Sequence, residues 1–263
     1  MIHPAYNLFL AIYLAHLLTD FVFQATRLVS NKHWNEWRGY LIHGVTHYVA
    51  LMAIVTLADP HRLPTLSFQL LAVSLSLVHL LVDWAKDSLT KSHRIPDNAL
   101  AFVMDQAIHL VTVIGAVFLL VHPSLQTFVF WLDRIRLLQE SILLVSVVYV
   151  LVIFGGGYFI RALIVPLWKE EEGQTAKEHR EVINAGLYIG WLERFLVLTA
   201  LFLQSPATVG FILAAKSIAR YPELKSVRFA EYFLIGTLLS VAIAIGGAIV
   251  LLKALYGTVA FGK

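Results

Sequence analysis

Eight long apolar segments dominate this chain of 263 residues and restrict what it can fold into. A helix that crosses the hydrocarbon core of a bilayer needs about 20 apolar residues. Charged residues make up only 14% of the chain, whereas soluble domains carry about 25%. We therefore predict an all-α, polytopic integral membrane protein with about eight transmembrane helices. The predicted spans are residues 5–28, 39–58, 66–88, 98–121, 140–165, 184–203, 206–220 and 229–255.

The basic residues predict how these helices are oriented. Lysine and arginine collect after the first, third, fifth and seventh segments, and the alternate loops hold little beyond Arg62 and the Arg134/Arg136 pair. Because short cytoplasmic loops carry an excess of positive charge, we expect these four loops in the cytoplasm and both termini outside. Residues 123–139 are typical of an amphipathic helix that lies in the membrane interface.

A repeated pair of polar residues stands out within the first four segments. "AHLLTDF" at 15–21 recurs as "VHLLVDW" at 78–84, so that His16 and Asp20 correspond to His79 and Asp83, 63 positions later. In the following segments, His43 and His47 correspond to Asp105 and His109, 62 positions later. This duplication of a hairpin, residues 5–58 and 66–121, predicts an N-terminal four-helix bundle with a pseudo-two-fold axis along the membrane normal.

The spacing of these pairs predicts a metal site. Residues four apart lie on one face of a helix, one turn from each other. A rise of 1.5 Å per residue then places all eight side chains roughly 7–18 Å from the expected cytoplasmic helix ends. They sort into an inner layer of four histidines and an outer layer that holds the carboxylates. The inner layer is His16, His47, His79 and His109, and the outer layer is Asp20, His43, Asp83 and Asp105.

The ligand types limit which metal fits this site. The chain has no cysteine, so only nitrogen and oxygen can bind the metal. We expect one or two divalent ions, with zinc favoured and iron or manganese as alternatives. The competing interpretation is a metal-free polar or proton-relay network. Polar contacts between membrane helices stabilise by about 0.6–2 kcal/mol each, whereas one Asp at mid-helix costs about 2.5–3.5 kcal/mol. The network is less favoured because its contacts would not offset the cost of its carboxylates.

Other polar residues are candidates for substrate contact. The catalytic candidates are the three carboxylates of the outer layer, Asp20, Asp83 and Asp105. Lys32, Lys86 and Gln106 are expected near the cytoplasmic edge of the site, where the lysines would meet an anionic group or simply be flanking charges. Glu193 and Arg194 are expected near mid-span, where charge is costly unless it is paired or hydrated. They would either form structural ion pairs, Glu193 with Lys216 and Arg194 with Glu231, or line a pocket for a polar head group.

Four stretches of the chain resemble a known family. "HLLTDFVFQ", "LIHGVTH", "HLLVDWAKD" and "FVMDQAIH" are similar to a bacterial membrane family known as domain of unknown function 3307, over roughly the first 120 residues. The resemblance implies a multi-pass protein of the bacterial inner membrane and brings no activity with it. A fainter similarity is to membrane-bound metal-dependent hydrolases with His-x-x-x-Asp and His-x-x-x-His helices.

These features together predict a domain organisation and a function. Residues 1–122 would form the metal-binding bundle, 123–139 the interfacial segment and 140–263 a second membrane helical region. The leading hypothesis is a metal-dependent hydrolase that acts from the cytoplasmic side on a lipid or lipid-linked substrate, phosphate-containing substrates included. The alternatives are a di-iron-type oxidoreductase acting on an acyl chain or quinone, and a metal or proton transporter. A net charge of +3 is too mild to indicate a nucleic-acid partner.

Overall fold

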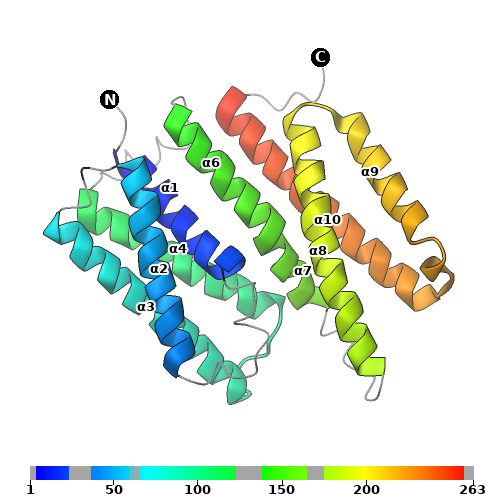
Figure 1. The fold of residues 1–263 in the computed structure, drawn as a ribbon, viewed down its shortest axis with the longest axis horizontal. Helices are drawn as coiled ribbons and strands as arrows, with labels where there is room; N and C mark the ends of the chain where they lie inside the picture. The colour runs from blue at the N-terminus through cyan, green and yellow to red at the C-terminus, as the bar shows by residue number, and fades with distance from the viewer. Residues whose placement is uncertain are drawn as a thin grey trace. The chain divides into compact units, whose positions relative to one another are not determined.

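The computed structural model describes residues 4–23, 37–59, 61, 65–122, 138–164 and 175–257, and within these ranges the chain is helical and contains no β-strand (Figure 1). The predicted all-α class is therefore confirmed. Lys32 and residues 123–137 of the expected interfacial helix lie outside the described residues. The helices are α1 (Pro4–Leu17), α2 (Trp37–Ala58), α3 (Leu66–Lys91), α4 (Ala99–Val121), α6 (Leu138–Val150), α7 (Gly156–Ile164), α8 (Thr175–Phe202), α9 (Pro206–Ala219) and α10 (Val227–Tyr256).

Six of the described helical stretches are long and apolar enough to cross a membrane, which makes this a polytopic membrane protein. They are Ala5–Phe23, Trp37–Ala58, Leu66–Lys91, Ala99–Val121, Glu140–Ile164 and Phe229–Tyr256. The other two predicted spans are also helical, as parts of α8 and α9. Helix α9 has 14 residues, which at 1.5 Å each fall short of a bilayer core of about 30 Å.

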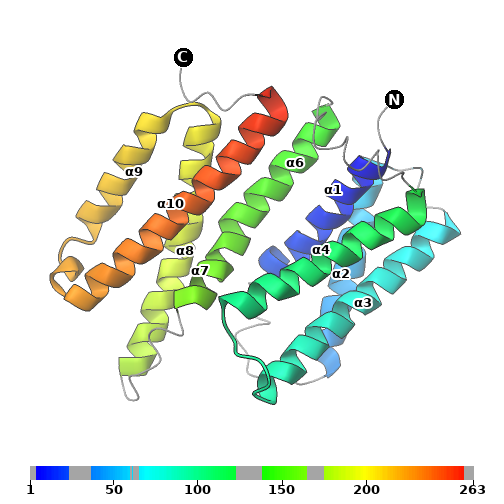
Figure 2. The same ribbon diagram turned by 180° about the vertical axis from the view of Figure 1, so that it is seen from behind.

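The first compact unit is Met1–Val150. Within it α1 packs on α2 and α4, and α3 packs on the same two helices, so that the four form a closed ring. Figures 1 and 2 show α1 and α3 running in one direction and α2 and α4 in the other, as the duplicated hairpin predicts. Helix α6 covers the remaining face of α1. Because α1 is enclosed on three sides, Leu10, Ala11, Ile12 and Ala15 are almost completely buried.

The second compact unit is Leu151–Lys263. Helix α10 packs along α8 and against α7, and α9 packs on α8 (Figure 2). The core between α8 and α10 contains Val197 and Leu198 on one helix and Ala244 and Ala248 on the other.

Two short π-helices interrupt the regular helices. The first, η1 (Leu18–Phe23), continues α1 and contains Asp20, and the second, η4 (Leu151–Gly155), joins α6 to α7. A π-turn shifts the backbone hydrogen bonds by one residue, and such turns are frequent at functional sites. Helical periodicity alone does not predict either of them.

Candidate functional site

Side chains from all four ring helices meet inside the first unit. His16 comes from α1, Asp20 from η1, His43 and His47 from α2, His79 and Asp83 from α3, and Asp105 and His109 from α4. The four inner-layer histidines are only 1–2% exposed. The structure thus brings together all eight residues that the sequence selected.

Four of these side chains surround one point. The Nε2 atoms of His43 and His79 lie 2.8 Å apart. His43 Nε2 is 3.6 Å from Asp20 Oδ1 and 3.2 Å from Asp83 Oδ2. His79 Nε2 is 3.2 Å from Asp20 Oδ1 and 3.3 Å from Asp83 Oδ2. Two nitrogens and two oxygens therefore converge, and we call this group the first cluster.

The separations within the first cluster are compatible with a tetrahedral metal site. For zinc bonds of 2.0–2.1 Å, neighbouring ligand atoms of a tetrahedron lie about 3.3–3.4 Å apart. Five of the six separations among these four atoms are between 2.8 and 3.6 Å. The donor set, two imidazoles and two carboxylates, is also one that zinc, iron and manganese accept.

Asp83 links the first cluster to a second one. Its Oδ2 faces His43 and His79, while its Oδ1 lies 3.1 Å from His109 Nε2. His109 Nε2 is in turn 3.6 Å from Asp105 Oδ1. We call Asp83, Asp105 and His109 the second cluster. A carboxylate that offers one oxygen to each of two neighbouring sites is the arrangement expected of a bridging ligand in a two-metal centre.

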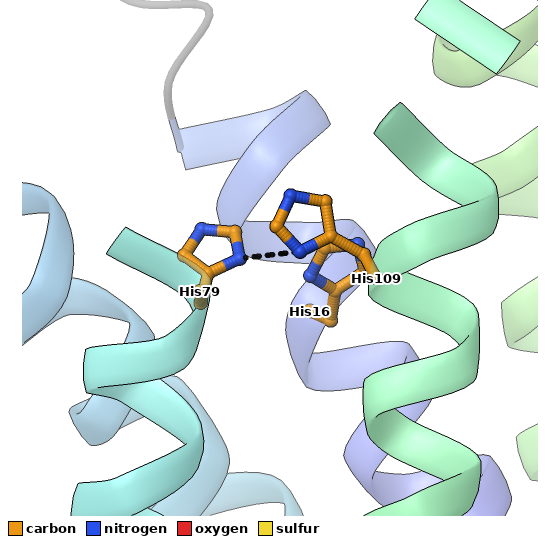
Figure 3. Close-up of side chains that lie close together, drawn as sticks. All are labelled: His16, His79 and His109. Carbon is orange, nitrogen blue, oxygen red and sulfur yellow. Dashed lines mark hydrogen bonds between the residues drawn. The ribbon is translucent and has the colours of Figure 1, made fainter. Parts of the chain in front are cut away.

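A group of three histidines lies beside these clusters (Figure 3). His79 Nδ1 and His109 Nδ1 are 3.2 Å apart, and the ring of His16 is centred 5.2 Å from that of His79 and 4.8 Å from that of His109. His16 Nε2 faces Asp20 Oδ2 at 3.6 Å. His79 and His109 therefore present one nitrogen to this group and the other to a carboxylate cluster.

Some polar atoms of the site are left without a partner. A neutral imidazole has one N–H and one lone pair, and a carboxylate only accepts hydrogen bonds. Within the described residues, His16 Nε2, Asp20 Oδ1 and Asp105 Oδ1 are buried without a hydrogen-bond partner. Leaving such atoms unpaired costs about 1–3 kcal/mol each, and more when the group is charged. Cations bound at the two clusters would pair with Asp20 Oδ1 and Asp105 Oδ1, so the donor set fits a metal.

His47 differs from the other seven residues. It belongs to none of the three potential ligand groups found in the described part of the chain. Its Nδ1 instead lies 3.1 Å from the hydroxyl of Ser76, and its ring stacks on that of His79 with centroids 4.4 Å apart. His47 thus holds His79 in place, and its role as a metal ligand stays a prediction. The sequence offered no signal for Ser76, since a serine on an apolar helix is common.

The edge of the site is formed by three partly exposed residues, Asp83, Lys86 and Gln106. Lys86 Nζ lies 2.9 Å from Asp105 Oδ2, and Gln106 Nε2 donates to the same oxygen at 3.3 Å. The side chains of Lys86 and Asp83 are 32% and 22% exposed, compared with 9% for Asp20. Solvent therefore reaches the site at Asp83 and Lys86. Next to this edge, the Tyr40 hydroxyl donates to Asp87 Oδ2 at 2.8 Å, a contact that sequence reasoning missed.

Glu193 and Arg194 belong to the second unit. Lys216 pairs with Glu193 Oε2 and donates to Thr237 Oγ1 at 2.9 Å. This is one of the ion pairs that the sequence allowed. Arg194 donates through Nε and Nη2 to the carbonyl oxygen of Ile153 at 3.0 and 2.8 Å, and through Nη1 to Ser240 Oγ at 3.3 Å.

The fold and the buried His/Asp cluster define an all-helical, polytopic membrane protein. The family model for DUF3307, described as a protein of unknown function, matches residues 8–138, which is about half of the chain and contains the whole cluster. The chain belongs to the DUF3307 family. Comparison with curated proteins and with solved structures finds no significant match.

Proposed function

We propose that this protein is a membrane-embedded, metal-dependent hydrolase that acts on a lipid or lipid-linked substrate. The observation that carries this proposal is the first cluster, whose nitrogen and oxygen atoms have the separations of a tetrahedral metal site. His43, His79, Asp20 and Asp83 would hold one divalent ion. Asp83, Asp105 and His109, with His16 nearby, would hold a second.

A divalent ion at this place would supply Lewis-acid activation of water and of the scissile group. Residues of the chain would accept the proton and bind the anionic part of the substrate. Asp83 is the most exposed carboxylate of the site, so it is the best-placed proton acceptor when only one of its two oxygens holds a metal. Lys86, at the exposed edge, would neutralise an anionic group such as a phosphate, in exchange for part of its contact with Asp105.

The membrane setting supports a lipid-type substrate. The site lies within α1 to α4, which are among the stretches able to span a bilayer. A substrate whose tail stays in the bilayer could present its polar group at Asp83 and Lys86 without leaving the membrane. The cytoplasmic side is proposed from the basic loops described above.

A second candidate is a di-iron-type oxidoreductase, and the position of Asp83 between the two clusters favours it, since carboxylate bridges also occur in di-iron bundles. Those bundles usually use Glu-rich ligation with Glu-x-x-His spacing, which this site lacks. A transporter of metal or protons is the third possibility and has no specific observation behind it.

Metal content and activity measured on the same preparation test the proposal. The full chain would be purified in mild detergent without a polyhistidine tag, and its metals determined by mass spectrometry. We expect about one or two equivalents of zinc, and hydrolysis of a panel of lipid esters and phosphate esters that chelation stops and zinc restores. A preparation with only traces of any transition metal would refute the metal centre. Stoichiometric iron with a visible absorption band that changes on reduction would favour the oxidoreductase.

A further inference from the structure

The second unit contains a polar cavity that the proposed hydrolase chemistry does not use. Two adjoining cavities, of about 50 and 100 Å³, share the side chain of Arg194 as part of their lining. The smaller one is also lined by Arg161, and the larger one by Glu193, Lys216 and Arg220. Most of the remaining lining is apolar, including Ile160, Ile164 and Phe233.

The charges around this cavity do not balance. Glu193 is paired with Lys216, and Arg220 lies 3.3 Å from Glu223. For Arg194 and Arg161, the described residues contain no carboxylate within ion-pair distance. Arg194 is only 2% exposed, and an uncompensated buried charge is costly. The cavity therefore has an excess of positive charge.

The backbone holds the Arg194 guanidinium at the cavity wall. A Cβ placed on Gly157 would come within 2.6 Å of Arg194 Nη2, and one on Gly190 within 3.2 Å of Nη1. The guanidinium thus lies in a slot between two glycines. Three of its five N–H groups bond to Ile153 and Ser240, which leaves two donors in a fixed orientation.

The larger cavity is also lined by a residue with an unpaired polar atom. Glu193 is 4% exposed, and its Oε1 is buried without a hydrogen-bond partner within the described residues. This oxygen can accept a hydrogen bond from a hydroxyl group. The cavity therefore offers two guanidinium donors for an anion, one acceptor for a hydroxyl and an apolar wall.

We propose that this cavity binds the anionic head group of an amphiphile, with a phosphate on Arg194 and Arg161 and a head-group hydroxyl on Glu193. The apolar wall at Ile160 and Ile164 would contact the first carbons of the tail. Inorganic phosphate could bind the same two arginines. A lipid would in addition contact the apolar wall, and this contact distinguishes the two ligands. This inference is independent of the metal centre in the first unit.

Thermal unfolding of the full chain in mild detergent tests this proposal. The probes are phosphatidylglycerol, which carries one phosphate and head-group hydroxyls, phosphatidylcholine, which is zwitterionic, and inorganic phosphate. We expect phosphatidylglycerol to raise the unfolding temperature by several degrees and phosphatidylcholine to leave it nearly unchanged. Stabilisation by inorganic phosphate to the same extent would support the anion site and assign it to free phosphate. Equal effects of the two lipids, without an effect of phosphate, would overturn the proposal.

Two variants and one control locate the effect. Arg194→Gln removes the buried charge, but it can also unfold the second unit. Arg161→Gln is therefore the decisive variant, because Arg161 is exposed and lines the same cavity. We expect it to reduce the stabilisation by phosphatidylglycerol at least twofold. Lys253→Gln removes one exposed positive charge of the same unit outside the cavity lining and should keep the full stabilisation. If Arg161→Gln and Lys253→Gln behave alike, the cavity is not the binding site.

Discussion

The two units of this protein both bury ionisable groups among apolar helices, but they satisfy them in different ways. In the second unit Glu193 has a lysine and Arg194 has the carbonyl oxygen of Ile153. In the first unit three carboxylates and five imidazoles crowd together, and several of their atoms have no partner within the described residues. Glu193 and Arg194 therefore each have a protein partner, although Glu193 Oε1 has none within the described residues. In the first unit the unpaired atoms belong to groups of potential ligands, and we propose that cations bind there.

The two π-turns also differ in how they contact buried ionisable groups. In η4, the carbonyl oxygen of Ile153 accepts two hydrogen bonds from the buried Arg194 guanidinium. In η1, the same kind of irregularity carries Asp20, whose Oδ1 stays without a hydrogen bond among the described residues. The first π-turn therefore positions a proposed metal ligand, and the second supplies a structural contact.

The largest expected effect is the loss of metal from His79→Ala. His79 contributes Nε2 to the first cluster and Nδ1 to the three-histidine group, so its removal disrupts both. We expect metal content, measured by mass spectrometry, to fall to the background level. His93→Ala, which removes an exposed histidine outside these clusters, is the control and should keep the parent's metal. Full metal content in His79→Ala would show that the first cluster is not the site.

The same measurement separates His109 from His47. Both residues were predicted to be inner-layer ligands, but only His109 belongs to potential ligand groups in the described part of the chain. We expect His109→Ala to lose metal and His47→Ala to retain most of it, because the described contacts of the His47 ring are with Ser76 and with the rings of His79 and His16. Equal losses of metal from the two variants would indicate that His47 is a ligand, as the sequence predicted.

The next largest effect is the loss of hydrolytic activity expected from Asp83→Asn. Asp83→Asn keeps one carbonyl oxygen for a metal but removes the proton acceptor at the exposed edge of the site. We expect hydrolysis to decrease about 10²–10⁴-fold while at least one metal ion stays bound. Asp87→Asn, on the same helix and bonded to Tyr40, is the matched control and should remain active. If Asp20→Asn, Asp83→Asn and Asp105→Asn all lose metal in step with activity, the carboxylates are ligands only.

A smaller effect is expected in the second unit. Arg194→Gln gives up bonds from a charged group to Ile153 and Ser240, so we expect the free energy of unfolding to decrease by about 1.5–3 kcal/mol. Arg220→Gln breaks only an exposed pair with Glu223 and should change the stability by about 0–1 kcal/mol. Thermal unfolding followed by fluorescence measures both. Loss of metal from Arg194→Gln would contradict the separate roles of the two units.

The smallest effect concerns the packing of the bundle. A Cβ on Gly44 of α2 would come within 2.6 Å of Leu80 Cδ1 on α3. Because Leu80 can shift its side chain, Gly44→Ala should destabilise by only about 1 kcal/mol. Gly115 of α4 has open space at the same position, so Gly115→Ala should be neutral or slightly stabilising. A larger loss from Gly115→Ala would show that α4 packs more tightly than the structure indicates.

Much of the first unit can be predicted from the sequence because its signals are local. Apolar runs of about 20 residues identify membrane helices, and a spacing of four residues places His16 with Asp20, and His79 with Asp83, on one helix face. The repeat then relates the two hairpins. These rules need only the geometry of a single helix, and with them the sequence determined the all-α class, the four-helix bundle and the eight polar residues that meet in it.

The tertiary structure decided what these residues do to one another. Which nitrogen faces which oxygen depends on side-chain rotamers and on how neighbouring helices face each other, and neither has a sequence period. Hence only the structure shows Asp83 between two clusters, His47 on Ser76 and Lys86 on Asp105. The π-turns and the glycine slot around Arg194 are likewise decided by packing, because a carbonyl oxygen or a missing Cβ acts only when another helix brings a side chain against it.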